Sequence, residues 1–227
     1  MTMNRDAELV EIRRMILSLG ATVEARLRCI CQAVTDLDLE AANLVRHGDR
    51  EIDEKEVEIE QACLRVLALS HPVAGDLRFL LAVLRINGDL ERIGDLVKGI
   101  AKRILDLERA PSVELPDALP QMATYARDMV DDALSALADE DADRCHHIRR
   151  ADKRLDDLQK EVIVWVHQSI PEQVETTQGA IDALSMARAF ERIGDLATNI
   201  AEDVIFLVRG AIVRHTSTSM RSSDTGA

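Results

Sequence analysis

Hydrophobic residues recur every three or four positions along most of the chain, which is the spacing of one face of an α-helix. The first such stripe runs from Leu9 to Val34 and predicts a helix over about 6–34. The same pattern predicts five further helices, over about 39–69, 73–108, 122–137, 141–169 and 173–210. We therefore expect an all-α fold built from six long helices.

The chain carries an internal duplication. The pentapeptide Glu-Arg-Ile-Gly-Asp occurs at Glu91–Asp95 and again at Glu191–Asp195, one hundred residues later. Apolar residues spaced by seven continue in step through both copies. Upstream of each copy, Ser-His-Pro at 70–72 matches Ser-Ile-Pro at 169–171, and proline ends or begins a helix because it lacks an N–H. The repeated unit is thus a helix, a proline turn and a second helix.

Three long helices with short connections in each half predict two similar antiparallel three-helix bundles in tandem. We expect the first repeat to span 1–110 and the second to span 121–210. The segment 111–120 holds the three prolines Pro111, Pro116 and Pro120 and is expected to be the linker. The Ser/Thr-rich end, 211–227, has the composition of a disordered tail.

Composition limits the possible partners. The formal net charge is −13, which opposes direct binding to nucleic acid. No apolar run approaches the roughly twenty residues that span a bilayer, and the N-terminus lacks a signal-peptide core, so we expect a cytoplasmic protein. The cysteines show no metal-site spacing, and we expect reduced, mostly buried thiols at Cys29, Cys31, Cys63 and Cys145.

The candidate chemistry lies in paired carboxylates. In each pentapeptide the glutamate and the aspartate are four residues apart, so both lie on one helix face. An Asp-x-x-x-Asp pair precedes each copy, on the flank of the apolar stripe of the preceding helix. All four pairs lie outside the main apolar seams, which predicts partly shielded sites at the bundle surface. The residues are Asp49, Asp53, Glu91 and Asp95 in the first half and Asp152, Asp156, Glu191 and Asp195 in the second.

Four converging carboxylates would repel one another unless a cation neutralised them. All-oxygen ligand sets suit Mg²⁺, Mn²⁺, Ca²⁺ or ferric iron. A single acidic pair on a helix is more often a solvated face, but the recurrence of both pairs in both halves favours metal binding. A common ancestor could also have preserved a purely structural motif, and the sequence leaves that alternative open.

Other residues of the pentapeptides suggest structural roles. Arg92 and Arg192 could form ion pairs with Asp95 and Asp195 at i+3. Gly94 and Gly194 each cost about 1 kcal/mol within a helix, which indicates close approach of a neighbouring helix or, less favoured, of a ligand.

No catalytic or nucleotide-binding motif is visible, so we do not expect an enzyme. A metal-storage or oxidoreductase bundle would require Glu-x-x-His pairs, and the sequence has none.

The duplicated motifs resemble those of the PhoU family of phosphate-signalling regulators. The resemblance rests on residues 72–78, 89–102 and 191–202 and covers about 6–210. It implies two similar three-helix bundles whose (Asp/Glu)-x-x-x-Asp motifs hold multinuclear metal clusters in some members. Carried over to this chain, those motifs are the eight carboxylates named above, and the implied cofactors are iron, zinc, manganese or magnesium ions.

The resemblance also implies a function. A member of the family would be a cytoplasmic negative regulator of the phosphate-starvation response and of high-affinity phosphate uptake. Its implied partners are a sensor histidine kinase, the ATPase subunit of the phosphate ABC transporter and a second copy of itself, with membrane association only through partners. The alternative is a metal-binding accessory protein of a low-affinity phosphate permease. Gly99, where the second half has Asn199, leaves equal metal loading of the two halves open.

Overall fold

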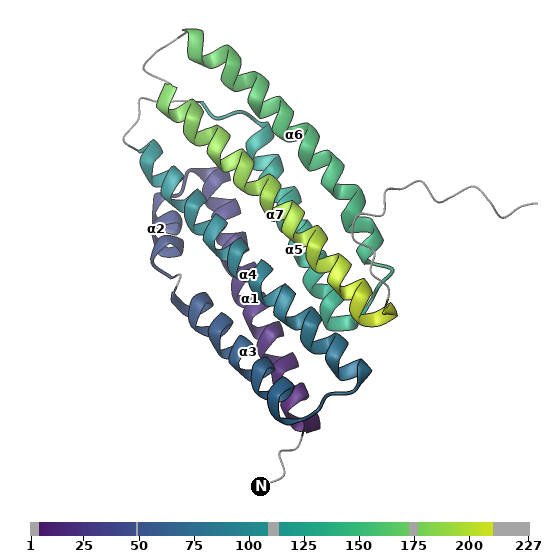
Figure 1. The fold of residues 1–227 in the computed structure, drawn as a ribbon. Coiled ribbons are helices and arrows are strands. Elements are labelled where there is room, and N and C mark those ends of the chain that lie inside the picture. Colours follow the sequence, from purple (N-terminus) through teal and green to yellow (C-terminus); the bar gives the residue numbers. More distant parts are fainter. Residues whose placement is uncertain (1–4, 49, 109–113, 173–176, 211–227) are drawn as a thin grey trace, which may run out of the picture.

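The computed structural model describes residues 5–48, 50–108, 114–172 and 177–210, and within these ranges it is helical and contains no strand (Figure 1). The all-α prediction is confirmed. The helices are α1 (Arg5–Asp36), α2 (Leu39–His47), α3 (Arg50–Leu69), α4 (Ala74–Leu107), α5 (Ala118–Asp139), α6 (Cys145–Glu172) and α7 (Thr177–Arg209). The final residues 211–227, predicted to be a disordered tail, lie outside the described residues.

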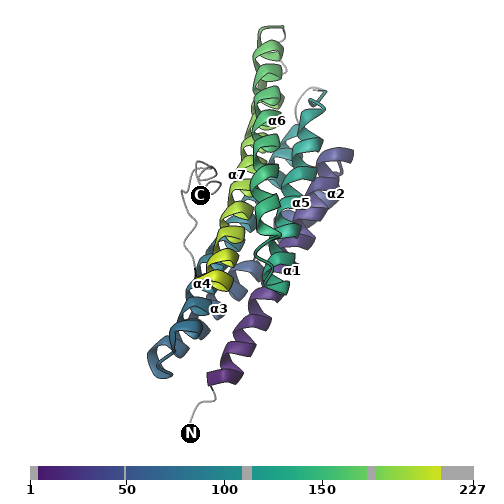
Figure 2. The ribbon, with the colours of Figure 1, turned by 90° about the vertical axis from the view of Figure 1, so that its right-hand side faces the viewer.

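The helices form two bundles with roughly aligned axes. In the first bundle α1, α3 and α4 pack together, with the short α2 against α1 and α4 (Figures 1 and 2). In the second bundle α5, α6 and α7 pack together. The prediction of two similar three-helix bundles is confirmed. No helix of the described segments is both long and apolar enough to cross a membrane.

One predicted helix, 39–69, is divided into α2 and α3. Asp38 caps the start of α2, because its Oδ1 accepts hydrogen bonds from the backbone N–H groups of Glu40 and Ala41, both at 3.0 Å. Gly48 caps the end of α2, and its N–H donates to the Val45 carbonyl at 3.2 Å. Glycine has the poorest helix propensity after proline, which accounts for the break. Asp49, the next residue, lies outside the described residues.

The start of α6 also differs from the prediction, since this helix begins at Cys145 rather than at Asp141. The Asp141 side chain accepts hydrogen bonds from the backbone N–H groups of Asp143 and Arg144, at 2.9 and 3.1 Å. Such local bonds favour a turn over a helix. The thiols match expectation, because Cys31, Cys63 and Cys145 are buried and free, and burial raises the pKa of Cys31 to about 12.

The two halves are joined along α4 and α7, which cross in antiparallel directions, and along α1 and α5. Near one end of the first interface, Arg85 of α4 donates to Asp203 of α7 at 3.2 Å. Near the other end, Arg103 of α4 donates to Asp182 of α7 at 3.1 Å. Asp182 and Asp203 are 0% and 1% exposed. A buried carboxylate is costly without such a partner, so these pairs fix how the halves meet.

Neighbouring helices approach closely at both pentapeptide glycines. A Cβ added at Gly94 would meet Ile52 Cδ1 of α3 at 2.9 Å, and one added at Gly194 would meet Leu155 Cδ2 of α6 more closely still. By contrast, a Cβ at Gly99 would meet no atom within 4 Å. The packing role predicted for Gly94 and Gly194 is confirmed.

Replacing Gly194 with alanine should destabilise the protein by about 1–2 kcal/mol, because overlap with the buried Leu155 outweighs the gain of about 1 kcal/mol in helix propensity. The matched change Gly99→Ala should stabilise it by up to about 1 kcal/mol. Urea denaturation of both variants measures the difference. A neutral or stabilising Gly194→Ala would show that the close approach does not require glycine.

Candidate metal-binding carboxylate surfaces

The glycine contacts also place the carboxylates. Ile52 packs on Gly94 and is followed directly by Asp53, while Leu155 packs on Gly194 and is followed by Asp156. Successive residues on a helix diverge by about 100°, so a residue next to a buried contact lies at its edge. The crossing of α3 over α4, and of α6 over α7, therefore brings an aspartate of one helix beside the pentapeptide carboxylates of the other.

In the first half the carboxylates gather around Glu91, which is partly buried, while Asp53 and Asp95 are exposed. Burial raises the pKa of Glu91, and the negative charges of Asp95, Asp53 and Glu56 raise it further. Like charges from both α3 and α4 thus act on Glu91, and the positive charge of Arg92 lowers its pKa by a smaller amount. Asp49, the fourth predicted member of this set, lies outside the described residues.

In the second half all four predicted carboxylates lie among the described residues, on α6 and α7. Burial is the largest cause of a raised pKa at Asp152, Glu191 and Asp195. Asp195 and Asp156 then raise the pKa of Asp152, and Asp156 raises that of Asp195. The pKa of Glu191 is likewise raised by the negative charges of Asp195, Asp156 and Asp152. Negative charges of α6 and α7 therefore act on one another where the helices cross, while the assignment of these residues to one site stays a prediction.

Glu56 is a member of the first-half surface that the repeat pattern did not identify. It is partly buried on α3, and burial, Glu60 and Asp53 raise its pKa. Its spacing from Asp53 is i+3, so it shares a helix face with that residue, and this was a usable signal. The equivalent position of the second half, counted from the Asp-x-x-x-Asp pair, is Gln159. The first half also has Lys98 where the second has Thr198, so its extra negative charge is accompanied by an extra positive one.

The predicted ion pair between Arg92 and Asp95 is wrong. Arg92 Nη1 instead lies 3.3 Å from Oδ1 of Asp89, three residues before it on α4. In the second half, Arg192 lowers the pKa of Glu191 and of Asp195 by its charge, without a recorded salt bridge to Asp195 in the described segments. Both pentapeptides therefore keep their Asp side chains out of ion pairs with the central arginine.

The donor set suits a hard cation, since every side chain offers carboxylate oxygens and several have raised pKa values. The described carboxylates are, however, spaced more widely than the ligands of a complete metal site. Within the described ranges, no three His, Cys, Asp or Glu side chains are grouped closely enough to hold a metal ion. The carboxylates form open acidic surfaces at the two helix crossings, and any cation would need these side chains to turn inward.

Raised carboxyl pKa values make the clusters unfavourable for folding when ionised. Their favourable contribution is present at low pH, where the groups are protonated, and is lost as pH rises from the ordinary carboxyl range through the raised pKa. In metal-free protein at pH 7, Glu191→Gln/Asp195→Asn should therefore raise the free energy of unfolding by on the order of 0.5 kcal/mol after screening is considered.

Urea denaturation in the presence of a chelator, at pH 7 and at about pH 4, measures the free energy of unfolding of both proteins. The stability gained by the double amide variant should be smaller at the lower pH. The matched control, Asp131→Asn/Asp139→Asn, removes two exposed carboxylates from α5. A double amide variant that is less stable than the original protein at pH 7 would contradict the repulsion.

Comparison with known proteins finds relatives along nearly the whole chain. A Serratia marcescens protein named phosphate-specific transport system accessory protein PhoU is 34% identical over 210 residues, covering 92% of this chain and 86% of that protein. A Pseudomonas putida homolog of the same name is 36% identical over 211 residues, covering 92% of this chain and 82% of that protein.

Solved structures share the fold. The crystal structure of PhoU from Pseudomonas aeruginosa has a TM-score of 0.86 and 34% identity, covering 91% of this chain and 99% of that one. That of the phosphate transport system regulatory protein PhoU from Streptococcus pneumoniae has a TM-score of 0.81 and 31% identity, covering 92% and 99%. The model of the PhoU domain matches this chain twice, at residues 16–104 and 119–204. The chain therefore belongs to the PhoU family.

Proposed function

We propose that this protein is an accessory protein of phosphate-specific transport that restrains the phosphate-starvation response when phosphate is plentiful. The observation that carries the proposal is the pair of PhoU domains, which together cover most of the chain and match relatives named as accessory proteins of that transport system. The fold agreement with two PhoU crystal structures supports it.

The mechanism proposed is docking rather than catalysis. The protein acts in the cytoplasm, as a homodimer, as an adaptor between a sensor histidine kinase and the ATPase subunit of the phosphate ABC transporter. Long helices joined through two interfaces offer extended rigid faces for such contacts. The net charge of −13 favours partners with basic surfaces and disfavours DNA, so regulation passes through proteins.

The two carboxylate surfaces are proposed to bind metal ions. Iron, zinc, manganese or magnesium would lower the repulsion that raises the pKa values of Glu91, Asp152, Glu191 and Asp195. A bound cation bridging two helices would also stabilise the crossing at Gly94 or Gly194. In this way metal loading could set the shape and charge of the surface that a partner meets.

Metal loading gives the first test. Replacing Asp49, Asp53, Glu91 and Asp95 with their amides should remove the metal of the first half while the second half stays loaded. The helix content should not change, because Asp53, Glu91 and Asp95 lie outside the apolar core and the sequence places Asp49 off the apolar stripe, so no cavity is expected. Elemental analysis of metal per chain, with Asp131→Asn/Asp139→Asn as control, gives the answer. An unchanged number of metal ions per chain would reject these residues as metal ligands.

A deletion strain tests the regulatory role. Without this protein, a reporter of phosphate-starvation genes should stay active in phosphate-rich medium, because the kinase has lost its restraint. Reintroducing the intact gene should silence the reporter again. A reporter that remains silent in the deletion strain would reject the proposed role and leave the low-affinity permease alternative standing.

A further inference from the structure

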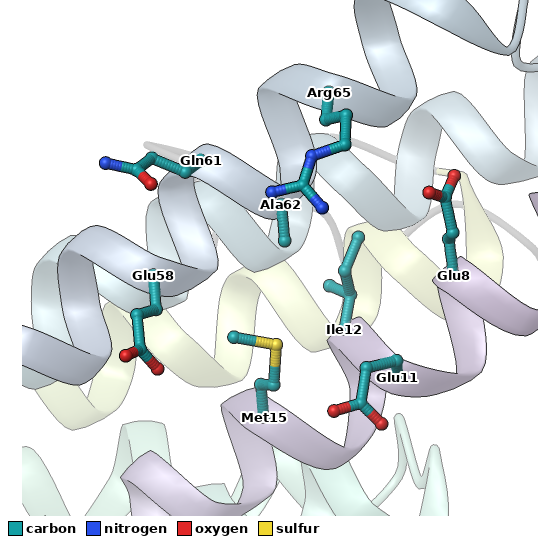
Figure 3. A pocket seen from close by; sticks show the side chains of 8 residues that line it. All are labelled: Glu8, Glu11, Ile12, Met15, Glu58, Gln61, Ala62 and Arg65. Carbon is teal, nitrogen blue, oxygen red and sulfur yellow. The ribbon is translucent and has the colours of Figure 1, made fainter.

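A groove between α1 and α3 lies apart from the carboxylate surfaces. It has a volume of about 270 Å³ and is lined by Glu8, Glu11, Ile12 and Met15 of α1 and by Glu58, Gln61, Ala62 and Arg65 of α3 (Figure 3). A second cavity of about 220 Å³ shares Met15 and Glu58 with it and extends the groove toward Ser18 and Lys55. The two helices are antiparallel here, so the groove follows both axes.

The floor of the groove is apolar. Ile12 and Ile59 are buried core residues, and the partly exposed Met15 and Ala62 lie above them. Ala62 is small and lies on α3 where α1 presents Ile12 and Met15, which leaves the space between the helices (Figure 3). The methionine side chain adapts to many apolar shapes, and such residues are common at helix-binding surfaces.

The walls carry charges without partners. Glu11 is paired with Arg14, and Lys55 with Glu51, so these four are satisfied within the chain. Glu8, Glu58 and Arg65 make no recorded ion pair or hydrogen bond in the described segments, and Oε2 of Glu8 is buried with no donor. A buried acceptor without a donor is unusual in a folded protein. The groove therefore offers the exposed carboxylate of Glu58 and, beside the buried Oε2, the partly exposed carboxylate of Glu8 to a donor supplied from outside.

We propose that this groove is the docking site for an amphipathic helix of a partner protein, which places apolar side chains on Ile12, Met15 and Ala62 and basic side chains at Glu8 and Glu58. The inference rests on the proposed adaptor function and assigns its partner surface. An apolar floor with carboxylates on both walls complements a helix with leucine-like residues one turn apart and lysine or arginine beside them.

The occupant is a basic helix because the unpaired wall charges are net negative: Glu8 and Glu58 against Arg65. Arg65 projects from α3 over Ile12 (Figure 3). There it can also pair with an acidic residue of the same incoming helix, which would fix the direction in which that helix lies.

The probe is a synthetic helical peptide of about 18 residues with leucines at i, i+4 and i+7 and arginines beside them. Its affinity for the full chain, measured by fluorescence anisotropy, should fall at least about tenfold with Glu8→Gln/Glu58→Gln and with Met15→Lys. The control pair Asp131→Asn/Asp139→Asn removes the same charge from α5 and should change the affinity less than about twofold. Circular dichroism verifies that each variant is folded.

Three further readouts locate the peptide. A photoreactive leucine in the peptide should form cross-links to α1 and α3. A peptide with glutamine in place of arginine should bind more weakly, and raising the salt from about 0.1 M to about 1 M should weaken the arginine peptide more than the glutamine peptide. Equal losses in the control pair, cross-links outside α1 and α3, or no binding at low salt would each overturn the proposal.

Self-association is distinguished by sedimentation of the chain alone. If Met15→Lys converts a dimer to a monomer, the groove belongs to a second copy and the proposal fails. The deletion reporter separates the remaining outcomes. A groove variant that loses the peptide yet restores full silencing rejects the groove as the regulatory surface while the proposed function stands. A silent deletion strain rejects the proposed function even if the peptide binds.

Discussion

The close approach of helices at the two pentapeptide glycines is the constraint on which the rest of the molecule depends. A side chain at Gly94 or Gly194 would occupy the space of Ile52 or Leu155. Because those residues pack directly on the glycine backbone, α3 packs closely against α4, and α6 packs closely against α7. The glutamate three residues before each glycine and the aspartate one residue after it then flank the crossing. The same glycine thus determines both the packing of each bundle and the position of its acidic surface.

The interface between the halves depends on a different interaction, and the duplication does not preserve it. Arg103 of the first half occupies the repeat position of Asp203, and Arg85 occupies that of Ser185. The ion pairs Arg85–Asp203 and Arg103–Asp182 therefore cross from one half to the other without a symmetric copy. Each buried aspartate receives a cation from the opposite half, and Asp182 also accepts a hydrogen bond from Gln178 of its own helix at 3.1 Å. Separating the halves would remove the arginine from a buried carboxylate at both ends of the interface, so these pairs favour the joined arrangement.

Much of the fold follows from the sequence because helix periodicity and the repeat are both local signals. Where prediction failed, local signals were ambiguous. Arg92 has an aspartate three residues away in each direction, and the sequence cannot rank them. The structure shows which of the two pairs with Arg92. Asp89 is only 6% exposed, so an ion pair stabilises it more than it would stabilise the exposed Asp95. Glu56 was missed because it has no carboxylate counterpart in the second half. The division at Gly48 needed the cap geometry, since single glycines inside helices are common.

The acidic surfaces themselves follow from the sequence only in part. The sequence spacing places each pair on one helix face. Which helices approach each other is decided by tertiary packing, here by Ile52 and Leu155 on the two glycines. The groove between α1 and α3 is likewise invisible in the sequence, because it reflects the absence of bulk at Ala62 rather than the presence of a motif.

The two surfaces differ in how charge is distributed, and this bears on how they would act. In the first half, Glu56 adds a carboxylate beside Asp53 and Glu91, and Lys98 follows Asp95 by three residues; the second half has the neutral Gln159 and Thr198 at those positions. An additional carboxylate strengthens the attraction for a cation, whereas a nearby lysine weakens it. The duplication therefore preserves the pairs of carboxylates without preserving their electrostatic surroundings, so the two surfaces need not respond alike to a change in cation supply.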